Sequence, residues 1–181
     1  MRFLIAVAAL LASPAAFAQS EPGDVAPRPK PAVAAAPAAD PAIANIYTAK
    51  LGQGWENWSF ATVELSADIG SPRMPIRVSA EGYKALYLHH APFSTAPYRG
   101  ITFLIQGVEK ESKVRLIAVA GGKPIEGKMK LITVKPGGWV KVVAALAELG
   151  AANTEIDGFW LQNDSGETIP NLYVADIALT E

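Results

Sequence analysis

From residue 44 to the C-terminus, the sequence alternates between short apolar runs, about a dozen residues apart, and turn-forming clusters of Gly, Pro, Asn and Asp. This spacing is typical of all-β sandwiches and barrels. It predicts strands at about 44–49, 56–64, 74–80, 84–90, 100–107, 113–120, 128–134, 138–143, 156–162 and 171–179. A helical turn is expected only at 143–149, before Gly150. Because no helices alternate with the strands, a parallel α/β sheet is not expected.

The first residues have the pattern of an export signal. Arg2 precedes the apolar run Phe3–Leu11, and residues 16–18 (Ala-Phe-Ala) have the small-x-small pattern that signal peptidase cleaves. We therefore predict a cleavable signal peptide over 1–18. The run is shorter than the roughly 20 apolar residues that span a bilayer, and no later run is longer. The mature chain is therefore expected to lack a membrane span and to be periplasmic or secreted.

Residues 19–42 consist largely of Pro, Ala and a few charged residues, and they contain no aromatic residue. They cannot supply a hydrophobic core, and Pro at this density favours an extended spacer of about 3 Å per residue. A frayed N-terminus without a function is the alternative. We expect the folded β-sandwich domain over 43–181. Because the chain has no cysteine, an ordinary hydrophobic core must stabilise this domain.

Charge and residue types argue against several functions. The formal net charge of −1 argues against nucleic-acid binding, which requires a basic surface. His89 and His90 are the only histidines and, as neighbours on a strand, point to opposite faces, so no metal site is expected from them. Residues 121–123 (Gly-Gly-Lys) lack the strand and helix that flank a phosphate-binding loop, and we predict a hairpin turn there.

Two-residue periodicity places large aromatic or polar side chains opposite the core face on several predicted strands. Leu86 and Leu88 are expected to face the core, which leaves Tyr87 and His89 on the other side. The same alternation separates Phe159 and Leu161 from Trp160 and Gln162, and Val114 and Leu116 from Arg115 and Ile117. With Trp58 added, the candidate ligand-binding residues are Trp160, Gln162, Tyr87, His89, Arg115 and Trp58.

The order of motifs along the chain resembles a known fold. The motifs are residues 54–59 (Gly-Trp-Glu-Asn-Trp-Ser), 138–142 (Gly-Trp-Val-Lys-Val), 156–162 (Ile-Asp-Gly-Phe-Trp-Leu-Gln) and 171–179 (Asn-Leu-Tyr-Val-Ala-Asp-Ile-Ala-Leu). This order is similar to the galactose-binding-like β-sandwich, the antiparallel jelly roll of many carbohydrate-binding modules, including those of family 11. The resemblance implies a non-catalytic sugar-binding domain.

The same resemblance implies a structural calcium near the first and last strands in some members. Asp176 matches the carboxylate of the last strand, whereas Thr48 and Lys50 occupy the opening strand where an acidic partner would be needed. We therefore expect no cofactor.

These observations predict an exported, non-catalytic protein that binds a poly- or oligosaccharide. Trp160, Tyr87 and Trp58 would stack on the C–H face of a sugar ring, and Gln162, His89 and Arg115 would bond its hydroxyls. Of the other tryptophans, Trp139 is expected in the core. Because Trp55 and Trp58 are three residues apart, at most one of them is expected on a binding surface.

Two alternatives stay open. A structural or protein-interaction domain of the cell envelope would bury Trp160 and disperse the polar residues. A small hydrolase would bring two carboxylates together in a cleft, and their spacing in the sequence selects no pair among the candidates Glu56, Glu64, Glu126, Asp157 and Asp164.

Overall fold

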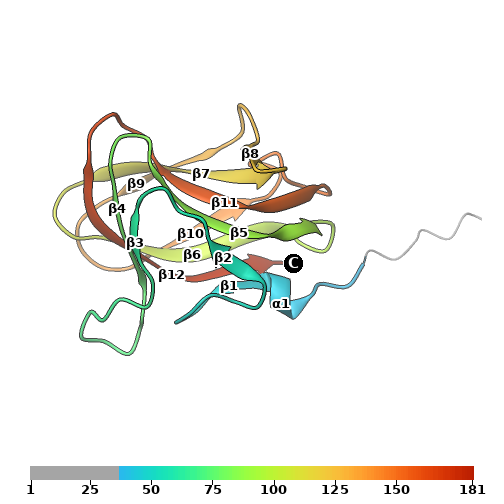
Figure 1. The fold of residues 1–181 in the computed structure, drawn as a ribbon, viewed down its shortest axis with the longest axis horizontal. Coiled ribbons are helices and arrows are strands. Elements are labelled where there is room, and N and C mark those ends of the chain that lie inside the picture. Colours follow the sequence, from blue (N-terminus) through green and yellow to red (C-terminus); the bar gives the residue numbers. More distant parts are fainter. Residues whose placement is uncertain (1–36) are drawn as a thin grey trace, which may run out of the picture. The chain divides into compact units, whose positions relative to one another are not determined.

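The computed structural model describes residues 37–181, which form two antiparallel sheets packed face to face (Figure 1). The expected all-β sandwich is confirmed. The predicted signal peptide, and all of the predicted spacer except its last residues, lie outside the described residues. Within the described part of the chain, no helix is long and apolar enough to cross a membrane.

The first sheet has the strand order β10, β6, β12, β4, β3, and β1 also pairs with β12. Its strands are β1 (Asn45–Tyr47), β3 (Thr62–Glu64), β4 (Ile76–Ala80), β6 (Gly100–Gly107), β10 (Val140–Ala145) and β12 (Ile169–Thr180). The second sheet has the order β2, β5, β11, β7, β8, and β9 also pairs with β7. Its strands are β2 (Trp55–Asn57), β5 (Ala85–Ser94), β7 (Ser112–Ala120), β8 (Lys123–Pro124), β9 (Lys130–Val134) and β11 (Glu155–Asn163).

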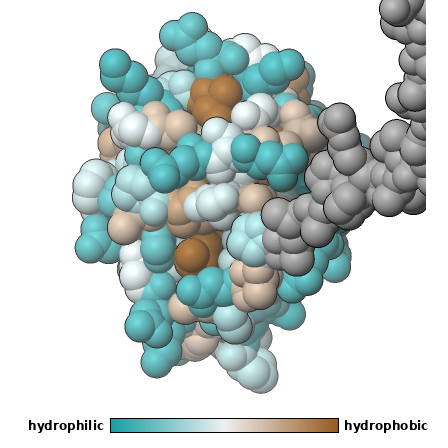
Figure 2. Space-filling model, turned by 90° about the vertical axis from the view of Figure 1, so that its right-hand side faces the viewer, coloured by the Kyte–Doolittle hydropathy of each residue, from teal (hydrophilic) through white to brown (hydrophobic). Residues whose placement is uncertain are grey.

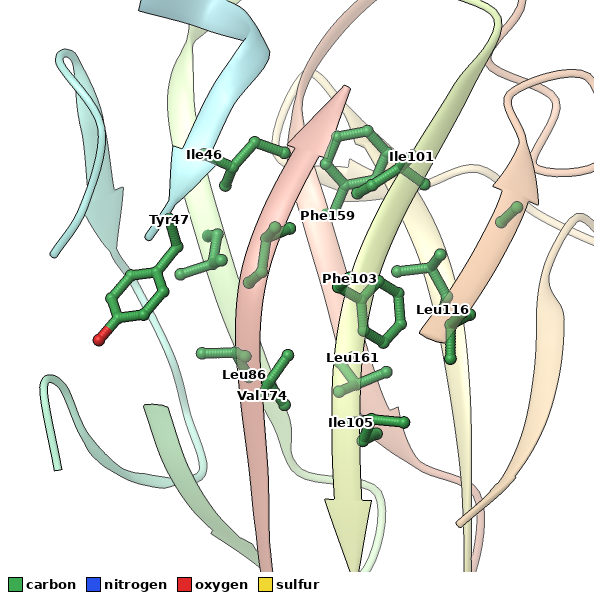
Figure 3. Close-up of a cluster of buried hydrophobic side chains, with 14 of the residues drawn as sticks. Ile46, Tyr47, Leu86, Ile101, Phe103, Ile105, Leu116, Phe159, Leu161 and Val174 are labelled. Atoms are coloured by element: carbon green, nitrogen blue, oxygen red, sulfur yellow. The ribbon is translucent and has the colours of Figure 1, made fainter. Parts of the chain in front are cut away.

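The hydrophobic core lies between the two sheets, as the two-residue periodicity predicts. Figure 3 shows side chains from β5, β7 and β11 meeting side chains from β6 and β12. The labelled residues of these strands are Leu86, Leu116, Phe159 and Leu161 on one side and Ile101, Phe103, Ile105 and Val174 on the other. The face assignments of β5, β7 and β11 are therefore correct. The surface in Figure 2 is mostly hydrophilic, with a few separate hydrophobic groups.

Several predicted strands differ from the structure in their bounds; the strand predicted at 84–90, for example, continues to Ser94 in β5. Two predicted elements differ in more than their bounds. The strand expected at 56–64 is interrupted, because β2 ends at Asn57 and β3 begins at Thr62 in the other sheet. The helical turn expected at 143–149 is wrong for its first residues: Val143 pairs with Thr102, and β10 continues to Ala145. Within and directly after this predicted segment, hydrogen-bonded turns are formed by 146–150. Here β-sheet pairing overrides the local helical pattern.

A short helix at the start of the described domain was not predicted. Helix α1 (Pro41–Ala44) has Asp40 as its N-cap, whose side chain accepts a hydrogen bond from the backbone N–H of Ala42 (2.8 Å). The backbone N–H of Asp40 donates to the Tyr98 hydroxyl (3.0 Å), which donates to the Asp40 carbonyl (2.9 Å). These hydrogen bonds join the N-cap of α1 to Tyr98, just before β6.

Three local expectations can be compared directly. Gly121 and Gly122, with φ of 58° and 72°, form the turn between β7 and β8, as predicted. Trp55 is buried and Trp58 is exposed, so only one of that pair reaches the surface. Trp139 is not part of the core. It is half-buried before β10, and the Arg73 guanidinium lies 5.1 Å from its ring centroid.

Candidate functional site

The outward surface of the second sheet carries the side chains that the alternation pattern singled out. Tyr87 of β5 is paired with Trp160 of β11, and in the next row Gln162 of β11 is paired with Arg115 of β7. His89 is paired with Glu56 of β2. We call this surface, from β2 to β9, the outer face of the second sheet. All the candidate ligand-binding residues lie on it.

Residues 58–61 follow β2 and continue along β5 with a few separate hydrogen bonds. The backbone N–H of Trp58 donates to the Tyr87 carbonyl (2.9 Å), and that of Phe60 donates to the Ala85 carbonyl (3.1 Å). Because side chains alternate along an extended segment, Glu56, Trp58 and Phe60 project on the same side. This segment therefore adds two large aromatic rings to the outer face.

Five rings on this face contact one another. They form the aromatic cluster: Trp58, Phe60, Tyr87, His89 and Trp160. Trp58 stacks on His89, with centroids 3.6 Å apart and an interplanar angle of 9°. Trp58 meets Tyr87 edge-on at 6.0 Å, and Tyr87 meets Trp160 at 5.8 Å. Phe60 meets Trp160 at 5.2 Å. The rings form a continuous path from β2 to β11.

The rings of the cluster differ in exposure, and this decides which can meet a ligand. Trp58 is 53% exposed and Phe60 is 40% exposed. Trp160 is half-buried, and Tyr87 is only 6% exposed because its neighbours cover it. Trp58 and Phe60 therefore offer accessible ring surface, whereas Tyr87 supports the rings around it.

Tyr87 is tied to a buried acid. Its hydroxyl donates to Asp157 Oδ1 (3.4 Å), and Asp157 Oδ2 accepts from the backbone N–H of Gly122 (2.6 Å). Burial, together with the negative charge of Asp157, raises the pKa of Tyr87 to about 12. The phenol is therefore neutral over the physiological pH range. Together, Tyr87 and Asp157 link β5 and β11 to the β7–β8 turn.

This raised pKa predicts a loss of stability at alkaline pH. The neutral phenol stabilises the fold fully below about pH 10, and its contribution is lost as the pH rises toward 12. The free energy of unfolding of the wild type should therefore fall more steeply than that of Tyr87→Phe between these values. Urea titrations at a series of pH values would measure it, and parallel curves for the two proteins would contradict the assignment.

Planar polar groups occupy the other end of the outer face. Gln162 Nε2 donates to the Tyr83 carbonyl (2.6 Å), and Gln162 Oε1 accepts from Arg115 Nε (2.8 Å). Arg115 Nη1 lies 3.5 Å from Asp164 Oδ1. Gln162 is therefore committed to contacts inside the protein. Arg115 is held in a fixed orientation and has further N–H groups.

Sequence reasoning missed several exposed residues of this face. Tyr83 precedes β5, is 56% exposed and has a φ of 60°. Its ring centroid lies 6.0 Å from Cζ of the Arg115 guanidinium. Leu131 of β9 is paired with Arg115 and is 65% exposed. Phe60 could have been found, because it lies two residues after Trp58 in the same predicted strand. The positions of Tyr83 and Leu131 depend on which strands are neighbours.

The candidate metal ligands of the sequence do not come together in the structure. His90 is paired with Trp55, whereas His89 faces Trp58, so the two histidines lie on opposite sides of β5. Asp176 Oδ2 lies 3.2 Å from Arg73 Nε, so this carboxylate already has a cationic neighbour. Among residues 37–181 no group of three or more His, Cys, Asp or Glu side chains is placed to hold a metal ion.

The candidate carboxylates of a hydrolase have different partners. Glu56 accepts from Trp58, Glu64 from Arg77 and Asp157 from Tyr87, while Asp164 faces Arg115 and Glu126 is exposed. In the described part of the chain, no hydrogen bond joins two of them. The contacts thus select no acid pair for hydrolysis.

The outward face of the first sheet also carries aromatic rings, and arginine side chains lie against them. On the first sheet, the Arg73 guanidinium lies over Trp139 (5.1 Å) and that of Arg77 over Tyr173 (5.8 Å). Both of these rings thus lie beside a cation of the protein itself, as Tyr83 lies beside Arg115 on the second sheet. By contrast, Trp58 and Phe60 on the second sheet leave ring surface open to solvent.

No protein-family profile matches the sequence. Among curated proteins, an endoglucanase from Dictyostelium discoideum is 26% identical over 148 residues, which are 75% of this chain and 21% of the endoglucanase. The chain therefore spans about a fifth of the length of that curated relative.

Solved structures of similar fold include carbohydrate-binding modules. A variant of a family 29 module in complex with mannohexaose has a TM-score of 0.52 at 14% identity, over 76% of this chain and 90% of that chain. A family 29 module from Piromyces equi has a TM-score of 0.50 at 17% identity, over 75% of this chain and 87% of that chain. At these identities the likeness shows the fold alone. It confirms the expected β-sandwich fold.

Proposed function

We propose that this chain is an exported, non-catalytic carbohydrate-binding protein and that the outer face of the second sheet is its binding surface. The observation that carries the proposal is the continuous aromatic cluster, with Trp58 and Phe60 exposed at one end and Arg115 held at the other. Sugars need flat apolar surface for their C–H faces and planar polar groups for their hydroxyls. Export rests on the predicted signal peptide.

Two further observations support this proposal. The solved structures of similar fold include modules whose function is to bind carbohydrate, one of them in complex with mannohexaose. The alternative of an envelope protein without a sugar site predicted a buried Trp160 and dispersed polar residues. Trp160 is instead half-buried, and Gln162 and Arg115 lie together beside it.

The geometry suggests different roles for the candidate residues. The exposed ring of Trp58 would stack on a sugar, and the half-buried Trp160 would extend the apolar surface under the next sugar. Tyr87 would support both rings from its position between them. Arg115 would donate hydrogen bonds to hydroxyls, while Gln162 would fix its orientation.

The proposal is tested by tryptophan fluorescence of the domain titrated with cellohexaose, mannohexaose, xylohexaose and laminarihexaose. We expect a saturable change with at least one of them. Trp58→Ala should weaken this binding about tenfold, because a stacked aromatic contributes about 1.5 kcal/mol. Trp139→Ala, on the opposite sheet, is the matched control and should bind like the wild type. A wild-type protein that responds to none of these sugars would contradict the proposal and favour the envelope protein.

A further inference from the structure

A single carboxylate oxygen links two residues of the aromatic cluster. Trp58 Nε1 donates to Glu56 Oε2 at 2.7 Å, and the same oxygen lies 3.6 Å from His89 Nδ1. The indole and the imidazole are nearly parallel, with an interplanar angle of 9° and centroids 3.6 Å apart. Glu56, Trp58 and His89 thus form one assembly at the β2 edge of the sheet.

In this assembly His89 is covered by Trp58. The His89 side chain is 16% exposed, and its Nδ1 is buried without a hydrogen-bond partner. By contrast, Trp58 is 53% exposed although His89 covers one of its faces. A ligand approaching this edge therefore meets the indole and not the imidazole. This differs from the hydrogen-bonding role that the sequence suggested for His89.

We infer that Glu56 and His89 are positioning residues that hold the Trp58 ring in one orientation before any ligand arrives. His89 is the surface on which the indole rests, and the Glu56 carboxylate fixes the direction of its N–H group. An exposed tryptophan without such contacts samples several rotamers and must be ordered on binding, which weakens affinity. The inference rests on the proposed function, because it assigns how one binding ring is prepared.

The role of Glu56 is tested by comparing two substitutions. Glu56→Ala removes the acceptor and should weaken binding of the responsive hexasaccharide three- to tenfold. Glu56→Gln keeps an acceptor oxygen and should restore most of the affinity. In a Trp58→Ala background, Glu56→Ala should have no further effect, because Glu56 acts through Trp58. An equal additional loss in that background would mean that Glu56 contacts the sugar itself and would overturn the inference.

The role of His89 is tested in the same way. His89→Phe keeps a ring stacked on the indole but has no ring nitrogen. Its affinity for the hexasaccharide should be within about twofold of that of the wild type. His89→Ala removes the ring and should weaken binding by about as much as Glu56→Ala. If His89→Phe loses as much affinity as His89→Ala, the imidazole nitrogens bind the sugar and the positioning role is wrong.

A measurement without sugar separates this inference from the proposed function. The indole N–H signal of Trp58, one of the four tryptophans in the chain, can be assigned by NMR from its loss in Trp58→Phe. It should exchange faster with water in Glu56→Ala than in the wild type or Glu56→Gln. Unchanged exchange in Glu56→Ala would overturn the positioning role. A wild type that binds no tested hexasaccharide contradicts the proposed function but leaves this result valid.

Discussion

Replacement of Asn163 by Ala is expected to lower the free energy of unfolding by about 3 kcal/mol, because several buried polar groups lose their partner together. Asn163 ends β11 and is fully buried. Its Nδ2 group has two N–H bonds and lies within hydrogen-bond distance of three carbonyl oxygens, those of Ala80 (3.1 Å), Glu81 (3.0 Å) and Glu167 (2.6 Å). Its Oδ1 accepts from the backbone N–H (3.0 Å) and the hydroxyl (2.9 Å) of Ser165.

Asn163 thereby joins the loop after β4 to the loop between β11 and β12. Urea denaturation of Asn163→Ala and of Asn171→Ala, an exposed asparagine on β12, would measure the effect. The control should change the free energy of unfolding by less than about 0.5 kcal/mol. A loss below about 1 kcal/mol for Asn163→Ala would show that water replaces the amide and that the hydrogen bonds contribute little.

Most strands could be predicted because their pattern is local. In 100–107, alternate residues enter the core, and β6 has the predicted bounds. The pattern fails where a tertiary contact decides the structure. Val143 could belong to a helical turn by its sequence, but pairing with Thr102 of β6 makes it part of β10. Nothing near Val143 in the sequence indicates that β6 is its neighbour.

The same distinction applies to the binding face. Alternation places Tyr87, His89, Trp160 and Arg115 on the non-core side of their strands, because this depends only on the two-residue period. Exposure on that side depends on the neighbouring strands. Tyr87 is buried because Trp58 and Trp160 lie on either side of it, and this follows from the order β2, β5, β11. That order cannot be read from the sequence.

The close approach of β5 and β11 also depends on a residue without a side chain. Gly158 lies beside His89 on the outer face, next to an irregularity in the pairing of β11 with β5. A Cβ atom at position 158 would overlap the backbone carbonyl of Leu88 and would lie 2.9 Å from the Tyr87 ring. Tyr87 can therefore lean over position 158 and reach Asp157 only because this residue is glycine.

Gly158→Ala is accordingly expected to lower the free energy of unfolding by about 3 kcal/mol, because β5 and β11 must separate at the centre of the second sheet. Tyr87 would lose its contact with Asp157, and the displaced ring would disturb Trp58 and Trp160 on either side of it. Sugar binding should fall together with stability. Gly138→Ala is the matched control, because a Cβ atom there meets no atom within 4 Å. Urea denaturation of both variants would measure the difference. If Gly158→Ala is as stable as Gly138→Ala, the sheet can relax around position 158, and the spacing of β5 and β11 does not position the aromatic cluster.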